Sequence, residues 1–171
     1  GDAAKQRYKL LGLDLEEVKK ELLKVNNLAV EGKPEDMVIT SHICRGNYHS
    51  TFFTSGPYDT VADYVFAKEN VDALFLEYDD ERSGGFAPLA KVSPDKKVVL
   101  GLITTKSPEL EDKESVIHRI NEAAKYVPLE RLYLSPQCGF ASCEIGNKLT
   151  EEQQWDKLRL VKEIAEEVWG K

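Results

Sequence analysis

Four side chains that commonly bind metal ions stand at the ends of short apolar runs. His42 and Cys44 lie two residues apart at the end of one run, Glu77 lies near the end of the next, and Cys138 follows the last. In an extended strand, residues i and i+2 point to the same face, so His42 and Cys44 are expected to share a face. One imidazole, two thiolates and one carboxylate form a tetrahedral ligand set suited to zinc. We therefore predict a zinc site formed by these four residues.

The charges of these ligands limit the chemistry of such a site. Two thiolates and a carboxylate leave a bound Zn²⁺ with a net charge of about −1. A centre of that charge activates water poorly, but it can hold an incoming thiol as a nucleophilic thiolate at neutral pH. The ligand set therefore favours alkyl transfer to a thiol over hydrolysis.

Packing is a competing explanation for each residue taken alone. A single cysteine at a strand end is most often a small buried side chain, and the acidic run 77–81 is typical of a solvated loop. Cys143 and His118 are interpreted as bystanders, and His49 lies in a loop at the rim of the site or has no role. The coincidence of four ligands at strand ends favours the metal site. A non-catalytic module whose cysteines only pack is the alternative.

The elements that must position these residues alternate between strands and helices. Short apolar runs predict strands at 37–44, 73–78, 98–104 and 131–136. Apolar residues at three- and four-residue steps predict amphipathic helices at about 15–29, 60–70, 113–127 and 151–168. The chain thus repeats a strand–helix unit.

Capping residues mark where three of these helices are expected to begin. Asp14 with Glu17 predicts the start of the first helix, and Asp59 is expected to cap the second. Thr150 with Gln153 forms the pattern of a capping box, in which each residue bonds the backbone of the other. The last helix is therefore expected to begin directly after Thr150.

Repeated strand–helix units with continuously apolar strands predict a parallel sheet. A small doubly wound sheet and half of a barrel both fit this order. The polar residues lie at the carboxyl ends of the strands, where barrel active sites are found, which favours the barrel. We predict that residues 1–171 form a single α/β domain, the C-terminal half of a (β/α)8 TIM barrel with four parallel strands and flanking helices. Half a barrel leaves strand edges unpaired, so we expect a longer protein.

The composition is that of a soluble globular protein, with 42% hydrophobic residues and a net charge of −7. No apolar run approaches the roughly 20 residues that span a bilayer, and the N-terminus lacks the apolar core of a signal peptide. We therefore expect a cytoplasmic protein with neither a nucleic acid nor a membrane as partner. Three cysteines without an export signal do not predict a disulfide framework.

Three segments together resemble the vitamin-B12-independent methionine synthase family, especially its short bacterial members that lack the N-terminal domain. These segments are SHICRGN (41–47), FLEYDDERSGGFAPL (75–89) and LSPQCGFAS (134–142). The resemblance runs from LGLDLEEV (11–18) to EIAEEVW (163–169) and corresponds to the second half of the catalytic barrel of that family.

The resemblance implies a reaction in which a methyl group passes from 5-methyltetrahydrofolate (polyglutamate) to the thiol of homocysteine to make methionine. It also implies that zinc is bound by His42, Cys44, Glu77 and Cys138. Long members carry a histidine in an I-H-S-P stretch that has a proton-donating role; here Lys106 replaces it and becomes the candidate proton donor. Related barrel families use a corrinoid donor or another thiol acceptor, which is the nearest alternative.

The same resemblance implies that Asn47, Arg82 and Ser83, which lie in matching motifs, line the substrate pocket. The family places most contacts to the amino and carboxylate groups of homocysteine in the first half of the barrel. The N-terminal half of the same barrel is therefore the expected partner, and this chain alone is expected to be inactive.

Overall fold

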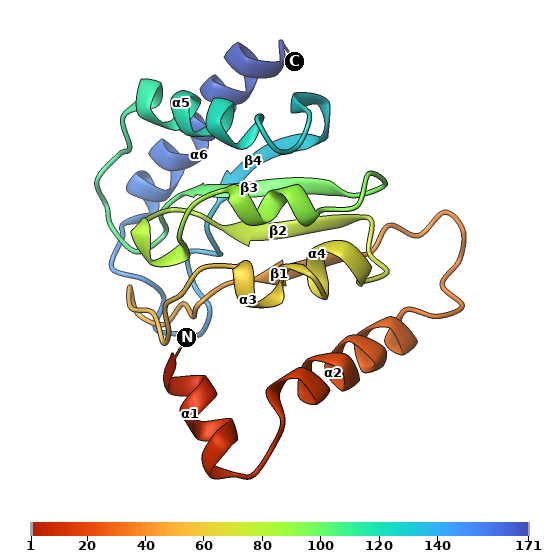
Figure 1. Cartoon of the computed structure of the whole chain (residues 1–171). Coiled ribbons are helices and arrows are strands. Elements are labelled where there is room, and N and C mark those ends of the chain that lie inside the picture. The colour runs from red at the N-terminus through yellow and green to blue at the C-terminus, as the bar shows by residue number, and fades with distance from the viewer. Residues whose placement is uncertain (1, 171) are drawn as a thin grey trace.

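The computed structural model describes residues 2–170, which fold around one four-stranded sheet (Figure 1). All its strands run parallel, in the spatial order β1-β2-β3-β4. The strands are β1 (Thr40–Ile43), β2 (Ala73–Glu77), β3 (Lys97–Ile103) and β4 (Leu132–Pro136). The first strand is shorter than the predicted 37–44, because Met37 and Val38 are exposed and pair with no strand.

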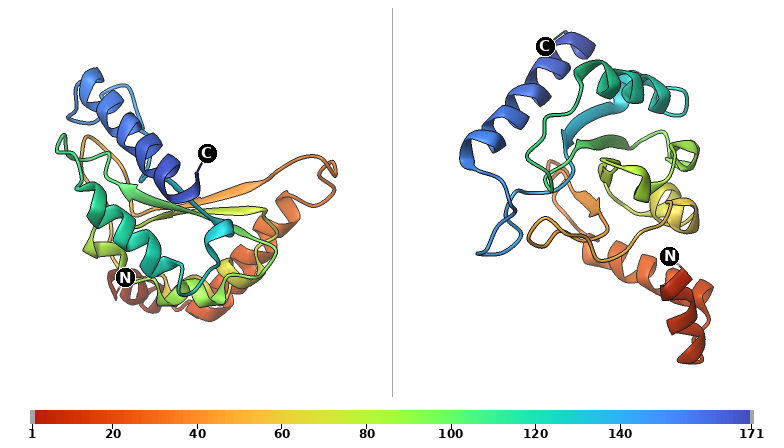
Figure 2. Two further views of the ribbon diagram at one scale, coloured as in Figure 1. Left: turned by 90° about the horizontal axis from the view of Figure 1, so that it is seen from above. Right: turned by 90° about the vertical axis from the view of Figure 1, so that its left-hand side faces the viewer.

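Helices lie around the outside of the curved sheet. The right-hand view in Figure 2 shows this for α4 (yellow), α5 (teal) and α6 (blue). The α-helices are α1 (Asp2–Leu10), α2 (Leu15–Ala29), α3 (Asp59–Ala62), α4 (Val65–Lys68), α5 (Lys113–Ala123) and α6 (Glu151–Trp169). Short 3₁₀ turns are η1 (Glu81–Ser83), η2 (Ala87–Lys91) and η3 (Leu129–Arg131). Among residues 2–170, none of the helices combines the length and the apolar character that a membrane-spanning segment requires.

Two of the predicted helix starts are confirmed. The Asp14 carboxylate accepts the backbone N–H groups of Glu16 and Glu17, and Thr150 and Gln153 form the reciprocal capping box. The predicted cap at Asp59 is wrong: Tyr58 already has helical backbone angles (φ −76°, ψ −8°), so Asp59 is the first residue of the helix.

Two of the predicted helix lengths are also wrong. The helix expected at 60–70 is divided into α3 and α4, which are separated at Asp63 and Tyr64. The helix expected to reach residue 127 ends at Ala123, and the chain turns so that Val127 is buried in the core.

The two faces of the sheet have different surroundings because alternate side chains point to opposite sides. On the outer face, Leu74, Val98 and Leu132 stand in register and are buried under the helices. On the inner face, the in-register row runs from His42 through Phe75 and Val99 to Tyr133, which is 42% exposed. The core therefore lies between the sheet and its helices, and the inner face is open.

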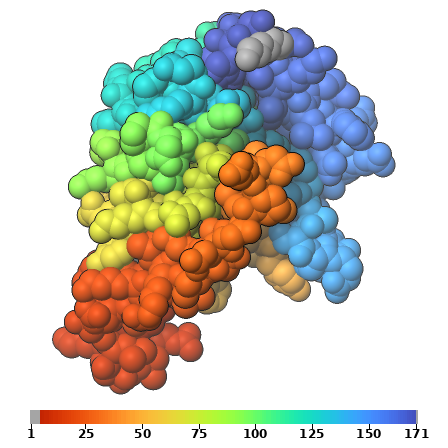
Figure 3. Space-filling model, turned by 90° about the vertical axis from the view of Figure 1, so that its right-hand side faces the viewer, coloured from red at the N-terminus to blue at the C-terminus, as the bar shows by residue number. Residues whose placement is uncertain are grey.

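Helix α2 stands apart from this core and contains no buried residue. It is attached by polar contacts: Asn26 Nδ2 donates to Glu69 Oε1 at 2.8 Å, and Asn70 N donates to Asn27 Oδ1 at 2.7 Å. The predicted amphipathic helix forms, but Leu22 and Val25 of its apolar stripe are exposed. The space-filling view in Figure 3 shows α1 and α2, in red and orange, protruding from the rest of the molecule.

Candidate metal centre

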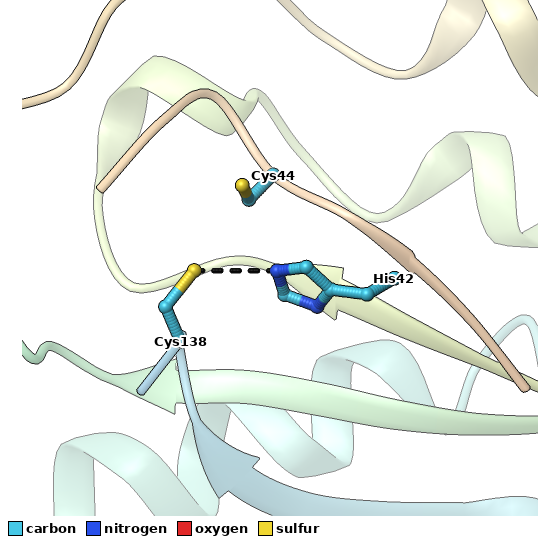
Figure 4. Close-up of side chains that lie close together, drawn as sticks. All are labelled: His42, Cys44 and Cys138. Carbon is cyan, nitrogen blue, oxygen red and sulfur yellow. Dashed lines mark hydrogen bonds between the residues drawn. The ribbon is translucent and has the colours of Figure 1, made fainter. Parts of the chain in front are cut away.

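Three of the four predicted ligands meet at the carboxyl edge of the sheet (Figure 4). His42 lies in β1, Cys44 directly follows that strand, and Cys138 follows β4. The Nε2 atom of His42 is 3.2 Å from Sγ of Cys138. One ligand atom from each of the three residues lies within 4.8 Å of the others. The edge strands β1 and β4 thus contribute to one cluster.

The convergence depends on how the chain leaves β4. The register between β3 and β4 shifts after Gly101, and Gln137 N donates to Ile103 O at 2.7 Å. The chain thereby crosses over β3 so closely that a Cβ atom on Gly101 would lie 2.9 Å from Cα of Gln137. Glycine at this position lets Cys138 reach toward β1.

The spacing of these atoms fits a tetrahedral zinc ion. Zinc bonds of roughly 2.0 Å to nitrogen and 2.3 Å to sulfur place tetrahedral ligand atoms about 3.5 to 3.8 Å apart. The observed separation of 3.2 Å between His42 and Cys138, and the limit of 4.8 Å for the group, bracket those values.

The pKa values of the ligands reflect their surroundings. Partial burial lowers the pKa of His42, the charge of Lys106 lowers it further, and Glu77 opposes the shift, so the imidazole is neutral and able to bind a metal. Burial, together with the neighbouring Cys44, raises the pKa of Cys138 to about 12. A bound cation would be needed to stabilise the Cys138 thiolate at neutral pH.

Glu77 lies beside this group but is not part of it. Its carboxylate is fully buried; Oε2 accepts from Arg45 N at 3.1 Å and from Gln137 Nε2, and Oε1 accepts from Arg82 Nε at 2.9 Å. Gln137 Nε2 is also 3.1 Å from Sγ of Cys138. Glu77 is therefore connected to the cluster through an amide.

Gln137 is the residue that sequence reasoning missed at this site. Its Oε1 atom accepts from Lys106 Nζ at 2.7 Å and from Thr105 Oγ1 at 3.1 Å. Its position directly before Cys138 was the one available signal, and polar residues beside cysteines are common in loops. Lys106 lies at the same edge, where partial burial lowers its pKa although Asp79 opposes the shift.

Each of the three predicted pocket residues forms hydrogen bonds or ion pairs with other groups of the chain near the cluster. Asn47 Nδ2 donates to Gly139 O and to Ser142 Oγ, each at 2.8 Å, and braces the loop that carries Cys138. Arg82 contacts three carboxylates, those of Glu77, Asp79 and Asp80. Ser83 is buried, with Oγ 3.5 Å from Glu77 Oε1. These residues shape the site, and contact with a substrate stays a prediction for them.

A shallow pocket of about 340 Å³ opens beside the cluster on the inner face of the sheet. It extends from His42 and Phe75 to the segment 135–139. A small ligand in this pocket would lie against His42 and Cys138. The cluster is therefore accessible from the open face.

Cys143 and His118, interpreted as bystanders, lie outside the cluster, as does His49, expected at the rim of the site or without a role. His118 is exposed on α5, as predicted, with Nε2 3.8 Å from Glu122 Oε1. Cys143 is a free cysteine and is absent from the ligand group. His49 lies in the loop after β1, and its Nδ1 atom is 3.1 Å from Gly146 O.

A parallel half barrel with a histidine–cysteine group at its carboxyl edge is thus the class of structure defined by fold and site. Residues 16–167 match a family model described as the catalytic domain of cobalamin-independent synthase. The chain belongs to this family.

Two relatives illustrate the range of similarity. YxjH of Bacillus subtilis (strain 168) is 54% identical over 169 residues, which cover 98% of this chain and 45% of YxjH. The methionine synthase of Pyrococcus horikoshii is 29% identical over 98 residues, covering 57% of this chain and 25% of that protein. The chain thus spans less than half the length of YxjH.

Solved structures agree with this fold. A candidate vitamin-B12 independent methionine synthase of Listeria monocytogenes aligns with a TM-score of 0.72 and 47% identity, over 94% of this chain and 44% of that one. A B12-independent methionine synthase of Shewanella sp. W3-18-1, solved with selenomethionine, aligns with a TM-score of 0.71 and 24% identity, over 90% and 44%. The predicted half of a (β/α)8 barrel is confirmed.

Proposed function

We propose that this chain supplies the zinc-binding half of a methyltransferase barrel that methylates the thiol of homocysteine to form methionine. The observation that carries the proposal is the convergence of His42, Cys44 and Cys138 from opposite edges of the sheet. Membership of the cobalamin-independent synthase family supports it, as does the similarity to proteins named methionine synthase.

Zinc is the metal that this donor set suits, and Glu77 is the fourth ligand in the proposal. When bound, zinc would hold the homocysteine thiol as a thiolate at neutral pH. To reach the metal, Glu77 would exchange part of its contacts with Arg45 and Arg82. The guanidinium groups of Arg45 and Arg82 place positive charge beside the Glu77 carboxylate.

We propose 5-methyltetrahydrofolate, in its polyglutamate form, as the methyl donor. As the thiolate sulfur bonds to the methyl carbon, the bond from that carbon to N5 breaks, and its electron pair stays on nitrogen. N5 then takes up a proton, which Lys106 would supply. The lowered pKa of Lys106 makes its ammonium a better acid than that of an exposed lysine.

A second half barrel would complete the site. On the inner face Tyr133 is exposed and His42 faces an open pocket, and within residues 2–170 no strand of the sheet pairs with the outer edge of β1 or β4. We propose that the N-terminal half of the barrel covers this face and contributes most of the homocysteine contacts. Asn47, Arg82 and Ser83 would border the pocket from this side. The chain alone would then be inactive.

Metal analysis tests the site first. The purified 171-residue chain should bind about one zinc per chain, and Cys138→Ser should abolish the binding. Cys143→Ser is the matched control, because Cys143 lies outside the ligand group, and it should keep its zinc. A chain without zinc affinity, or equal loss in both variants, would contradict the proposal and favour a module whose cysteines only pack.

A methylation assay tests the reaction. The chain alone should form no methionine from homocysteine and 5-methyltetrahydrofolate, and addition of the N-terminal half should produce it. Methionine formation by the chain alone would refute the need for a second half. Formation with methylcobalamin but not with the folate would replace the proposed donor by a corrinoid.

A further inference from the structure

The carboxamide of Gln137 lies between two of the proposed ligands. Gln137 is 1% exposed, and its Nε2 atom donates to Glu77 Oε2 and lies 3.1 Å from Sγ of Cys138. An amide NH₂ group has two hydrogens, and here each has an acceptor. The same amide group therefore contacts a carboxylate and a sulfur of the site.

The surroundings fix the direction in which this amide points. Its oxygen accepts from Lys106 Nζ at 2.7 Å and from Thr105 Oγ1 at 3.1 Å. An ammonium group can only donate and an ionised carboxylate can only accept. A reversed amide would set its NH₂ group against Lys106 and its oxygen against Glu77, which is unfavourable at both ends. The N–H groups must therefore face Glu77 and Cys138.

The backbone holds the amide in place as well. Gln137 N donates to Ile103 O, and the absence of a side chain at Gly101 allows the close crossing over β3. Gln137 follows β4 directly, where the sheet positions it. The side chain thus extends from a residue next to the strand whose backbone is bonded to β3, which keeps its contacts with the two ligands well defined.

We propose that Gln137 is a positioning residue of the metal site. One amide N–H holds the Glu77 carboxylate next to the sulfurs, and the other bonds Sγ of Cys138 and reduces the electron density that this sulfur donates to a bound metal. Groups that hydrogen-bond to metal ligands commonly set their orientation and their donor strength in this way. The inference rests on the zinc site proposed above.

Zinc and cobalt titrations of the whole 171-residue chain test the inference. Gln137→Met removes both N–H groups with little change in volume. Because the Glu77 carboxylate is then no longer held beside the sulfurs, which outweighs the stronger donation by Cys138, zinc affinity should fall about 10- to 100-fold. With Co²⁺ as a spectroscopic probe, the sulfur-to-cobalt charge-transfer band should move to longer wavelength, because the sulfur loses its hydrogen bond. Gln6→Met, on an exposed position of α1, is the matched control and should change neither quantity.

The outcomes separate this inference from the proposed function. If the unaltered chain binds neither zinc nor cobalt, the proposed function fails. If it binds both and Gln137→Met changes neither the affinity nor the band, only the role of Gln137 is overturned. A lower affinity with an unmoved band would overturn the hydrogen bond to sulfur.

A second variant keeps the test decisive if Gln137→Met does not fold. Thr105→Val removes the 3.1 Å contact to Oε1 while keeping the shape of the side chain. It should shift the band in the same direction by a smaller amount, because the amide is then held less firmly. An unshifted band in this variant would overturn the inference.

Discussion

Nε2 of His42 lies 3.2 Å from Sγ of Cys138, although 96 positions separate the two residues in the chain. His42 belongs to β1 and Cys138 follows β4, the two edge strands of the sheet. They meet because the segment after β4 crosses β3 at Gly101. The metal cluster is thus a property of the whole sheet.

Gly101→Ala should therefore disrupt both the carboxyl end of β3 and the metal site. The new Cβ would lie 2.9 Å from Cα of Gln137 and from Leu76 O, so backbone must move. We expect a loss of about 1–3 kcal/mol in the free energy of unfolding, as for other overpacked sites, together with weaker zinc binding. Urea unfolding and zinc titration measure the two effects. Gly85→Ala, where a Cβ meets no atom within 4 Å, should change neither.

Removal of the charge of Lys157 should destabilise the fold strongly. Lys157 of α6 is fully buried, and its Nζ donates to Glu109 O at 2.6 Å and to both oxygens of Glu111 at 3.1 Å. Lys157→Met leaves the partly buried Glu111 without its counter-ion, which costs about 3 kcal/mol or more in comparable pairs. Thermal and urea unfolding test this value. An equally small effect in Lys157→Met and in the exposed Lys162→Met would contradict it.

The hydroxyl of Tyr58 should stabilise the ends of β1 and β2. It accepts from Glu77 N at 2.8 Å and lies 2.7 Å from Ile43 O, to which it donates. Tyr58→Phe leaves the buried Glu77 N and the partly buried Ile43 O without this partner, at a cost of about 1–3 kcal/mol. Tyr126→Phe, on an exposed ring, serves as the control in the same unfolding assay. Equal stability of the two variants would show that the hydroxyl has no structural role.

The carboxylate of Asp72 should make part of the stability dependent on pH. Its Oδ2 atom accepts from Ile39 N at 2.7 Å and from Lys33 Nζ at 3.4 Å, and these bonds lower its pKa from the ordinary value of 3.8. Because the pKa is lower in the folded state, the stabilisation is complete above pH 3.8 and is lost as the pH falls through the folded-state pKa.

Asp72→Asn tests this directly. The difference in free energy of unfolding between the original chain and the variant should be largest at neutral pH and should shrink as the pH falls below 3.8. Urea unfolding at a series of pH values measures it. A difference that is constant across this range would mean that the ionised carboxylate does not contribute.

Local patterns predicted the elements and much of the site. The two-residue spacing of His42 and Cys44 placed both at one edge, and the residue types at Cys138 and Glu77 pointed to a metal. The caps at Asp14 and Thr150 were recognisable because they depend on neighbours within a few residues. Such features are encoded locally, so the sequence is enough to find them.

Some features that depend on distant contacts could not be predicted. The amide of Gln137 meets Glu77 from 60 positions away, and no local pattern marks that contact. The Tyr58 ring is buried in the core, and the backbone angles of Tyr58 are helical. Asp59 is therefore the first residue of the helix and not its cap. Periodicity alone could not tell that Leu22 and Val25 of α2 are uncovered, because a stripe of apolar residues does not identify what covers it.

The crossing of the chain over Gly101 has a mechanical consequence. An ion held by His42, Cys44 and Cys138 would cross-link the first strand to the segment that follows the last strand. Unfolding would then have to break this cross-link. The temperature of thermal unfolding would therefore rise as metal is added and fall when a chelator removes it. The supply of metal would then affect the lifetime of the folded state as well as the reaction at the carboxyl edge of the sheet.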